Sequence, residues 1–530
     1  MKTRINFKDE FYQKLKLLVL PIAIQNFMLA LVSATDAIML GWIDQTSLSA
    51  VSLAGQVQFV LSLFISGIAA GAGIMAAQYW GKQDAASIEK VIPIALRTNL
   101  LFSGLFTILA GFCPEMLMRI FTNDAALVAS GSQYLRAVAL SYVLCGISQV
   151  YLILLKNTGH AAVSSRISST AVVLNIILNA ILIYGLCGAP ALGIRGAAYA
   201  TVAARVVELI WAYLETKKPE RVRILWNRLF SSAGKILSED FWRYTLPVLA
   251  ASLVWGIAYV LYSVIMGHMG SDAVAANSIT SIAKSLLSCL IRGVSGGAGV
   301  LIGNLLGANE LEKAREYGRR LSHLSIAIGI VTGGLLMLIS PAIVHFAPLS
   351  DTAAEYLQYM LLFCGLNLMA QSVNTTVLDG IFCAGGDAKF DMQGNIGAMW
   401  CFSVPLGFLA AFWLKLPVMV VYCIVNLDEI VKLPAVYHHY KKYIWVRNIT
   451  RDVEDQFSHH LQSLPPAAST GCNTQKASEE SHIHTGLFSE AFDYSIDCSI
   501  DYFLDDYMDF LSAISAIFAS FRRVSPWTRL

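Results

Sequence analysis

A succession of twelve apolar segments is the feature that most constrains how this chain can fold. A helix of about 20 apolar residues crosses the hydrocarbon core of a bilayer, and each segment reaches that length. Charged residues make up 14% of the chain, against about 25% in a typical soluble protein. The pattern therefore predicts an all-α polytopic membrane protein with twelve transmembrane helices. The segments cover about residues 15–40, 50–78, 91–113, 132–155, 165–187, 193–214, 241–267, 277–304, 320–346, 354–382, 391–414 and 417–437.

Basic residues gather on one side of this array of segments, with Arg119, Arg195 and Lys415 as the exceptions. Cytoplasmic loops of membrane proteins are enriched in Lys and Arg, so both chain ends are predicted to be cytoplasmic. We expect a multi-pass protein of the plasma (inner) membrane. The basic parts are the N-terminus and the loops 79–90, 156–166, 216–240 and 305–320, and the loops without Lys or Arg are 41–49, 268–276 and 345–353.

The two halves of the chain repeat each other. When the sequence is shifted by 226 residues, residues 20–90 align without a gap on residues 246–316, and 13 of the 71 positions are identical. Five of the identical residues are Gly and one is Pro, the residue types that fix backbone geometry. Both halves begin on the same side, so the repeat is parallel, with an axis along the membrane normal. Two such bundles enclose a central cleft suited to alternating access.

The repeat defines the expected domains. An N-terminal six-helix lobe covers residues 1–215, a basic cytoplasmic linker covers 216–240, and a C-terminal six-helix lobe covers 241–450. The remaining residues, 451–530, form a polar tail with 12 acidic residues against 5 Lys or Arg. Within the tail, 502–523 has the apolar spacing of one amphipathic helix, and the alternative is a disordered extension.

Two prolines occupy equivalent places in the repeat. Pro21 and Pro247 each stand near the start of the first helix of their lobe. A proline there can bend a helix that lines the cleft and act as a hinge. The alternative is a proline tolerated near a helix end.

Asp36 is an acid inside the first apolar segment, where a carboxylate costs about 2.5–3.5 kcal/mol and marks a candidate functional site. A carboxyl buried in this way can take up and release a proton. Because Asp36 is only five residues from Gly41, the alternative is an acid near the outer interface.

Several motifs resemble the multidrug and toxic compound extrusion (MATE) family over about residues 10–450. Leu-Pro opens both lobes, TDAIMLG surrounds Asp36, and QYWGK (78–82) and NLLGA (304–308) end the second and eighth helices. AGGDAKF (384–390), followed by MW and Pro405, and the C-terminal EIVKLP and WVRNIT look most like the DinF-like branch. The resemblance implies a transporter that couples drug efflux to entry of H⁺ or Na⁺.

The resemblance also implies a cation-coupling site in the N-terminal lobe. Asp36 would bind the cation, with Asn175, Asn179 and Thr201 as partners on the fifth and sixth helices. Asn175 and Asn179 are four residues apart and share one helix face. Some family members have an acid where Asn179 stands, so oxygen ligands for Na⁺ and a proton site are both possible. The alternative for each Asn is an interhelical hydrogen bond.

In the C-terminal lobe, Asp379 and Arg292 are candidates for the substrate cavity. Some relatives pair an acid at the Asp379 position with one in the seventh helix, but here that second position is Trp255. Asp379 is interpreted as a site for cationic substrate, and Arg292 as a contact for anionic substrate or a neutraliser of Asp379. Trp255, Tyr259 and Tyr262 are expected to line the cleft and favour organic cations. Two charged sets, Arg205 with Glu208 and Asp428, Glu429 with Lys432, are predicted to form structural salt bridges.

These observations predict a secondary active exporter of organic cations or amphipathic drugs, driven by antiport with H⁺ or Na⁺. The sequence has no GxxxxGK[ST] motif, so we expect neither direct ATP drive nor an enzyme activity. The expected partners are a small organic molecule and the lipid bilayer, with no cofactor, no nucleic acid and a monomeric state. The alternatives are a flippase for a lipid-linked precursor, which would need more cations in the cavity, and a membrane scaffold without transport.

Overall fold

The computed structural model describes residues 9–43, 45–219, 221–224, 229, 234–347 and 349–450. Within these residues the regular structure is entirely helical. The predicted tail helix at 502–523 lies outside the described residues.

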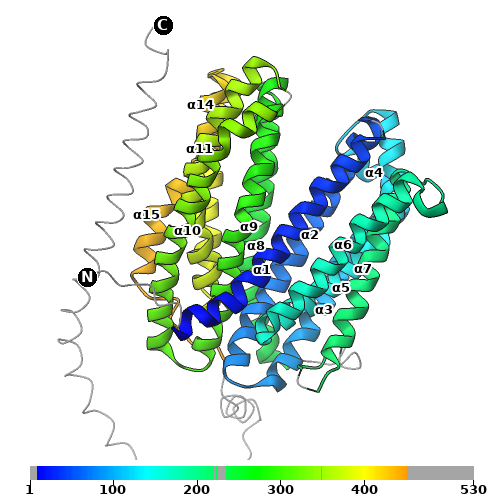
Figure 1. The fold of residues 1–530 in the computed structure, drawn as a ribbon. Helices are drawn as coiled ribbons and strands as arrows, with labels where there is room; N and C mark the ends of the chain where they lie inside the picture. Colours follow the sequence, from blue (N-terminus) through cyan, green and yellow to red (C-terminus); the bar gives the residue numbers. More distant parts are fainter. Residues whose placement is uncertain are drawn as a thin grey trace, which may run out of the picture. The chain divides into compact units, whose positions relative to one another are not determined.

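The N-terminal half forms one bundle of long helices (Figure 1). A π-helical stretch, η1 (Lys156–His160), joins α5 to α6, and Thr158 and Gly159 leave helical geometry there so that the chain turns back. The helices are α1 (Glu10–Gly41), α2 (Gln45–Gly81), α3 (Ala85–Phe112), the short α4 (Pro114–Arg119), α5 (Ala125–Leu155), α6 (Ala161–Tyr184) and α7 (Ile194–Thr216), with a 3₁₀ turn η2 (Leu186–Gly188).

The C-terminal half repeats the pattern with more π-helical interruptions. Such interruptions occur often at functional sites. The helices are α8 (Lys235–Gly267), α9 (Ser271–Gly307), α10 (Leu311–Phe346), α11 (Asp351–Thr375) with η4 (Thr376–Phe382), α12 (Ala388–Asn395), η5 (Ile396–Ser403), α13 (Val404–Phe408), η6 (Leu409–Trp413), α14 (Val418–Val425) and α15 (Asp428–Tyr440).

The predicted fold class is confirmed. Ten helical spans among the described residues are long and apolar enough to cross a membrane. One of them, Ala125–Tyr184, folds back at η1 and supplies two crossings. Helices α14 and α15 cover the twelfth predicted segment, 417–437. The observed helices extend beyond the apolar segments by up to nine residues because their polar ends continue past the hydrocarbon core; α8, for example, begins at Lys235.

The repeat is visible in how the two bundles touch. Helix α1 packs against α9, and α2 packs against both α8 and α9. Gly293 lies against Ala23, and the residues 226 positions away, Gly67 and Leu249, make the matching contact. A Cβ on either Gly would collide with the facing helix, so the repeated glycines are those that bring the bundles together.

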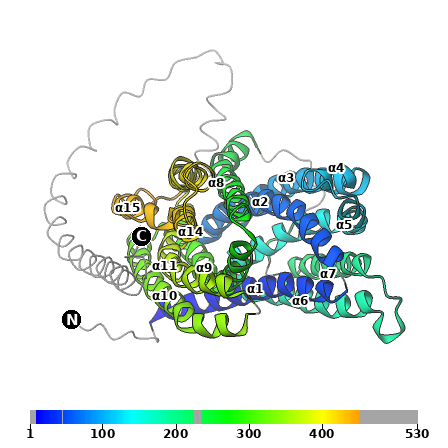
Figure 2. The same cartoon turned by 90° about the horizontal axis from the view of Figure 1, so that it is seen from above.

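One end of the assembly is closed by the ends of α2 and α9. We call it the basic end, because the basic stretches 79–90 and 305–320 and the start of α1, with Lys14 and Lys16, belong to it. Gly81 contacts the backbone of Asn304, and Gly307 contacts that of Gln78. Figure 1 shows the bundles meeting at this end and separating toward the other, and Figure 2 shows the same helices from above.

A C-terminal segment, residues 441–450, strengthens this closure. Trp445 of this segment is fully buried and packs on Gly318. Gln78 of α2 donates from Nε2 to the Ala384 carbonyl (2.7 Å) and accepts at Oε1 from the Ile449 amide (2.8 Å). The side chain of Gln78 therefore ties the N-terminal bundle to two stretches of the C-terminal half.

Adding a single methyl group at this closure is expected to be costly. In Gly307→Ala the new Cβ would overlap the Gln78 carbonyl, which cannot move without displacing α2. We expect a loss of about 1–3 kcal/mol of stability, as for other overpacked sites, measured as a lower Tm in detergent. Gly334→Ala is the control, because no atom lies within 4 Å of its added Cβ. Equal Tm values for the two variants would contradict the close approach of α2 and α9.

Candidate functional site

Four polar residues of the N-terminal half form a connected cluster, here called the N-lobe polar cluster: Asp36, Asn175, Asn179 and Thr201. Asn179 Nδ2 donates to Asp36 Oδ1 (2.5 Å) and to Asn175 Oδ1 (3.2 Å). Asn175 Nδ2 in turn donates to Thr201 Oγ1 (3.3 Å). Three helices, α1, α6 and α7, therefore meet at hydrogen bonds that centre on one carboxylate.

The cluster lies toward the end opposite the basic end. Asp36 and Asn179 are each five residues from the end of their helix, which is about 8 Å of helix. Tyr184 covers the site on the side of the helix ends, where its hydroxyl donates to the Met39 carbonyl (2.7 Å). Apolar side chains such as Leu40 and Leu135 form the surrounding core. Asn179 is only 1% exposed, so the cluster is shielded despite its position.

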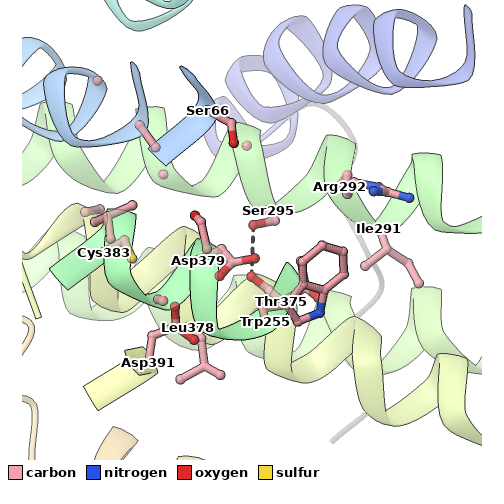
Figure 3. Close-up of a pocket in the computed structure, with 18 of the residues that line it drawn as sticks. Ser66, Trp255, Ile291, Arg292, Ser295, Thr375, Leu378, Asp379, Cys383 and Asp391 are labelled. Atoms are coloured by element: carbon pink, nitrogen blue, oxygen red, sulfur yellow. Dashed lines mark hydrogen bonds between the residues drawn. The ribbon is translucent and has the colours of Figure 1, made fainter. Parts of the chain in front are cut away.

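A second feature is a central cavity of about 510 Å³ between the two halves. Helices α1, α2, α5 and η1 contribute its walls on one side, and α8, α9, α11, η4, α12 and α15 contribute them on the other. Figure 3 shows Asp379 beside Ser295 and Thr375, where Ser295 Oγ donates to the Thr375 carbonyl (2.9 Å). Asp379 stands in the π-helical stretch η4 and its side chain is exposed to the cavity.

Behind Asp379 lies a set of buried charged and amide groups, here called the Lys432 network: Asp391, Asn395, Asp428, Glu429 and Lys432. Lys432 Nζ lies 3.2 Å from Glu429 Oε1 and 3.7 Å from Asp428 Oδ2, and it donates to Asn395 Oδ1 (3.1 Å). Asn395 Nδ2 donates to Asp391 Oδ1 (3.1 Å). All five residues are at most 8% exposed, so three buried carboxylates share Lys432 as the one cation of the network.

Both halves of the chain match a known protein family. The MatE family model matches residues 21–181 and again residues 247–409. The chain belongs to the MatE family. The two matches begin 226 residues apart, which is the offset found in the sequence, and this confirms that each half of this MatE protein is one copy of the family unit. It is therefore a multi-pass membrane transporter of the multidrug efflux family and not an enzyme.

Individual relatives resemble this MatE protein over most of its length. The uncharacterized transporter YisQ of Bacillus subtilis is 21% identical over 427 residues, which is 81% of this chain and 93% of that protein. The probable multidrug resistance protein NorM of Thermotoga maritima is 24% identical over 77% of this chain and 87% of its own. A solved structure of a MOP superfamily transporter from Pyrococcus furiosus has a TM-score of 0.74 at 19% identity, covering 84% of this chain and 99% of that one.

The structure brings some of the predicted substrate residues to the cavity and not others. Asp379, Arg292 and Trp255 line it. Tyr262 does not: it is 8% exposed and packs in a core with Met399, so its prediction as a cavity residue is wrong. Tyr259 also lies outside the lining; it stacks on Trp255 with ring centroids 5.5 Å apart. Sequence position on α8 could not separate the faces, because apolar and aromatic residues surround this helix.

The contribution of Asp391 and Asn395 to the cavity was not predicted from the sequence. They share one face of α12 at a spacing of four residues, and that polar pair in an otherwise apolar segment was the available signal. The predicted salt bridges of Lys432 with Asp428 and Glu429 are present, as is that of Arg205 with Glu208 at 2.6 Å. Glu429 and Lys432 also line the cavity, so the Lys432 network contributes charged groups to the cavity wall as well as joining helices.

The two prolines lie inside continuous helices. Pro21 is within α1 and Pro247 within α8. Each removes one backbone donor, and the Pro21 carbonyl accepts a hydrogen bond from Ser165 Oγ (2.6 Å) on α6. Their role as hinges stays a prediction.

Proposed function

We propose that this MatE protein exports organic cations or amphipathic drugs by antiport with H⁺ or Na⁺, working as a single chain without ATP. The observation that carries the proposal is the N-lobe polar cluster: a carboxylate and amides gathered within one bundle, apart from the central cavity. Relatives described as probable multidrug resistance proteins support the same substrate class.

The buried amide oxygen of Asn179 is the chemical reason to expect cation binding in the N-lobe polar cluster. Its Nδ2 serves both Asp36 and Asn175, while its Oδ1 is buried and accepts no hydrogen bond from the described residues. A buried acceptor without a donor costs about 1–3 kcal/mol. A Na⁺ between Asp36 and Asn179 Oδ1 would satisfy that oxygen, and a proton carried by Asp36 would do so once the Asn179 amide turns its oxygen toward the carboxyl. The cluster therefore favours the loading of one small cation.

Helix α1 connects the cluster to the cavity. Ile22 and Asn26 line the cavity, and Asp36 lies ten residues further along the same helix, about 15 Å away. Cation binding at Asp36 would act on substrate through the position of α1, with Pro21 as the hinge. By linkage, substrate must lower cation affinity by the same factor as the cation lowers substrate affinity.

The orientation follows from charge. With the basic end placed in the cytoplasm of the plasma (inner) membrane, both described ends of the helical array face the cytoplasm, and the two bundles diverge toward the outside (Figure 1). This is the state in which an exporter would release substrate and load an external cation.

Proteoliposomes test the proposal directly. A cationic dye such as tetramethylrhodamine methyl ester is followed under an imposed ΔpH, an imposed ΔNa⁺ or neither, without ATP. We expect transport against the dye gradient under one of the two ion gradients, and that gradient identifies the coupling ion. Transport that ignores both gradients would contradict antiport.

Flippase activity toward a lipid-linked precursor is the second candidate. The observation in its favour is that Lys156, Arg292 and Lys432 all line the cavity, which is more positive charge than the sequence indicated. Carboxylates from Asp379, Asp391 and Glu429 accompany them, so the cavity is mixed rather than cationic. The same liposomes with a fluorescent phosphatidylglycerol test this candidate, since a flippase would move that lipid between leaflets.

A further inference from the structure

Residues 441–450, here called the strap, follow α15 and run across the basic end. The first part of the strap is anchored on the C-terminal half. Trp445 is fully buried and packs on Gly318 of α10. Arg447 donates through Nε and Nη2 to the two carbonyls of the turn 385–386, at 2.7 and 2.6 Å. A buried indole and two charge-assisted hydrogen bonds therefore fix the strap to its own half.

The last residues of the strap contact the N-terminal half through Gln78 of α2. Gln78 Nε2 donates to the Ala384 carbonyl (2.7 Å), and its Oε1 accepts a hydrogen bond from the Ile449 amide (2.8 Å). Gln78 is 0% exposed, so these bonds are shielded from water. Ile449 is buried too and belongs to a core cluster with Ile88 and Val91 of α3. The strap is thus anchored on one half and ends on the other.

The starts of α1 and α8 also cross between the halves at the basic end. Phe11 of α1 packs against Tyr317 of α10, with ring centroids 4.9 Å apart, and Phe241 of α8 belongs to the core cluster of α2 and α3. Each helix has a proline, Pro21 or Pro247, between this contact and most of its length. A bend at that proline would let the contact persist while the halves separate.

The contact of the strap with Gln78 has no such proline to relieve it. Gln78 lies in the last turn of α2, where Gly81 and Gly307 bring α2 and α9 into close contact. Opening of the basic end must separate these helix ends, and Gln78 then loses both Ala384 and Ile449. The contact is weak enough to be broken in each cycle, because one net hydrogen bond changes an equilibrium by only about twofold to tenfold.

We propose that Gln78 and the strap form a releasable gate at the basic end: the strap stays on the C-terminal half, and Gln78 leaves it whenever that end opens. The inference rests on the proposed function, in which the halves alternate between outward and inward opening. It gives a role to the stretch WVRNIT (445–450), which the sequence offered only as part of a family resemblance.

Cys383 is a native reporter for the state of this gate. It lines the central cavity (Figure 3) and directly precedes Ala384, whose carbonyl accepts the hydrogen bond from Gln78. In inside-out membrane vesicles, a membrane-impermeant sulfonated maleimide reaches the cavity from the basic end only while that end is open. Labelling of Cys383 is measured by peptide mass spectrometry. The measurement needs neither an ion gradient nor a substrate, so it does not depend on transport.

Gln78→Met removes both hydrogen bonds and keeps an unbranched side chain of similar length. We expect the rate of Cys383 labelling to rise about tenfold, as two lost hydrogen bonds predict. Gln358→Met is the matched control, because Gln358 donates to Ser340 Oγ (3.2 Å) within the C-terminal half and should leave the rate unchanged. An unchanged rate in Gln78→Met, or an equal rise at the buried Cys364, would overturn the gate.

Reversible cross-links distinguish a gate from a permanent contact. In a Cys383→Ser background, Gln78→Cys with Ile449→Cys joins the two halves through a short bifunctional methanethiosulfonate. Arg315→Cys with Tyr443→Cys joins the strap to α10 inside one half, where the guanidinium lies 5.5 Å from the Tyr443 ring. We expect the first link to abolish dye transport until dithiothreitol is added, and the second to leave it unchanged. Transport through the first link, or an equal block by both, would contradict the proposal.

Failure of the proposed function gives a different result. If the dye is not carried under ΔpH or ΔNa⁺ but Gln78→Met still raises the labelling of Cys383, the gate stands and antiport falls. If the dye is carried and neither Gln78→Met nor the link between the halves has an effect, antiport stands and the gate falls.

Discussion

Asp36→Asn is expected to abolish gradient-driven efflux while leaving the protein folded. Asparagine has nearly the same shape, and its Oδ1 can still accept the hydrogen bond from Asn179 Nδ2. It cannot carry a negative charge, so neither a proton nor Na⁺ can be loaded and released in the cycle. We expect the initial rate of dye efflux under the driving gradient to fall at least about tenfold, equivalent to about 1.4 kcal/mol of lost coupling.

The controls for this variant separate coupling from binding. Equilibrium dye binding should persist in Asp36→Asn, because Asp36 does not line the cavity. Asp351→Asn removes an exposed acid from the first turn of α11 and should transport like the wild type. Undiminished gradient-driven efflux in Asp36→Asn would refute the role of the N-lobe polar cluster, even if the protein is an exporter.

Lys432→Met is expected to be the most destabilising single substitution in the C-terminal half. Lys432 is 5% exposed and lies within 4 Å of two carboxylates. Removing one partner of a buried ion pair costs about 3–5 kcal/mol, because the remaining charges are left uncompensated. We expect a fall of several degrees in Tm in detergent and a poor yield of folded protein.

A compensating substitution makes this prediction specific. Lys432→Met combined with Glu429→Gln should recover part of the lost Tm, since fewer buried negative charges then lack a partner. Lys389→Met removes an exposed lysine and should leave Tm unchanged. If Lys432→Met and Lys389→Met had the same Tm, the Lys432 network would not be the buried ionic unit described here.

Local sequence pattern accounted for the helices and the repeat. A transmembrane helix is recognised from about 20 consecutive apolar residues, so α2, predicted at 50–78, is found at Gln45–Gly81. The glycines shared by the two halves were also informative, because Gly81 and Gly307 meet the facing helix where a side chain would not fit. The DinF-like branch and the tail helix at 502–523 stay predictions.

Prediction of the candidate site was harder, because the site is made by contacts between residues that are far apart in the chain. Asp36 and Asn179 are 143 positions apart in the chain, and only the family resemblance placed them together beforehand. Tyr262 and Asp391 show the limit of prediction from sequence. Tyr262 was expected in the cavity and lies in the core, whereas Asp391, at the start of an apolar segment, was not predicted and lines the cavity.

The sequence by itself determined the class of protein, the number of membrane crossings and the duplication. Hydropathy, basic loops and the 226-residue offset of the repeat can all be read from the order of the residues, without knowing which residues touch. The tertiary structure decided which charges are paired and which are free. Lys432 is paired with Glu429 one turn away on α15 and donates to Asn395 of α12, whereas Lys156 and Arg292 line the cavity and form no hydrogen bond or ion pair among the described residues. That difference arises from how helices from both halves pack around one space, and helix packing is set by contacts between residues far apart in the chain.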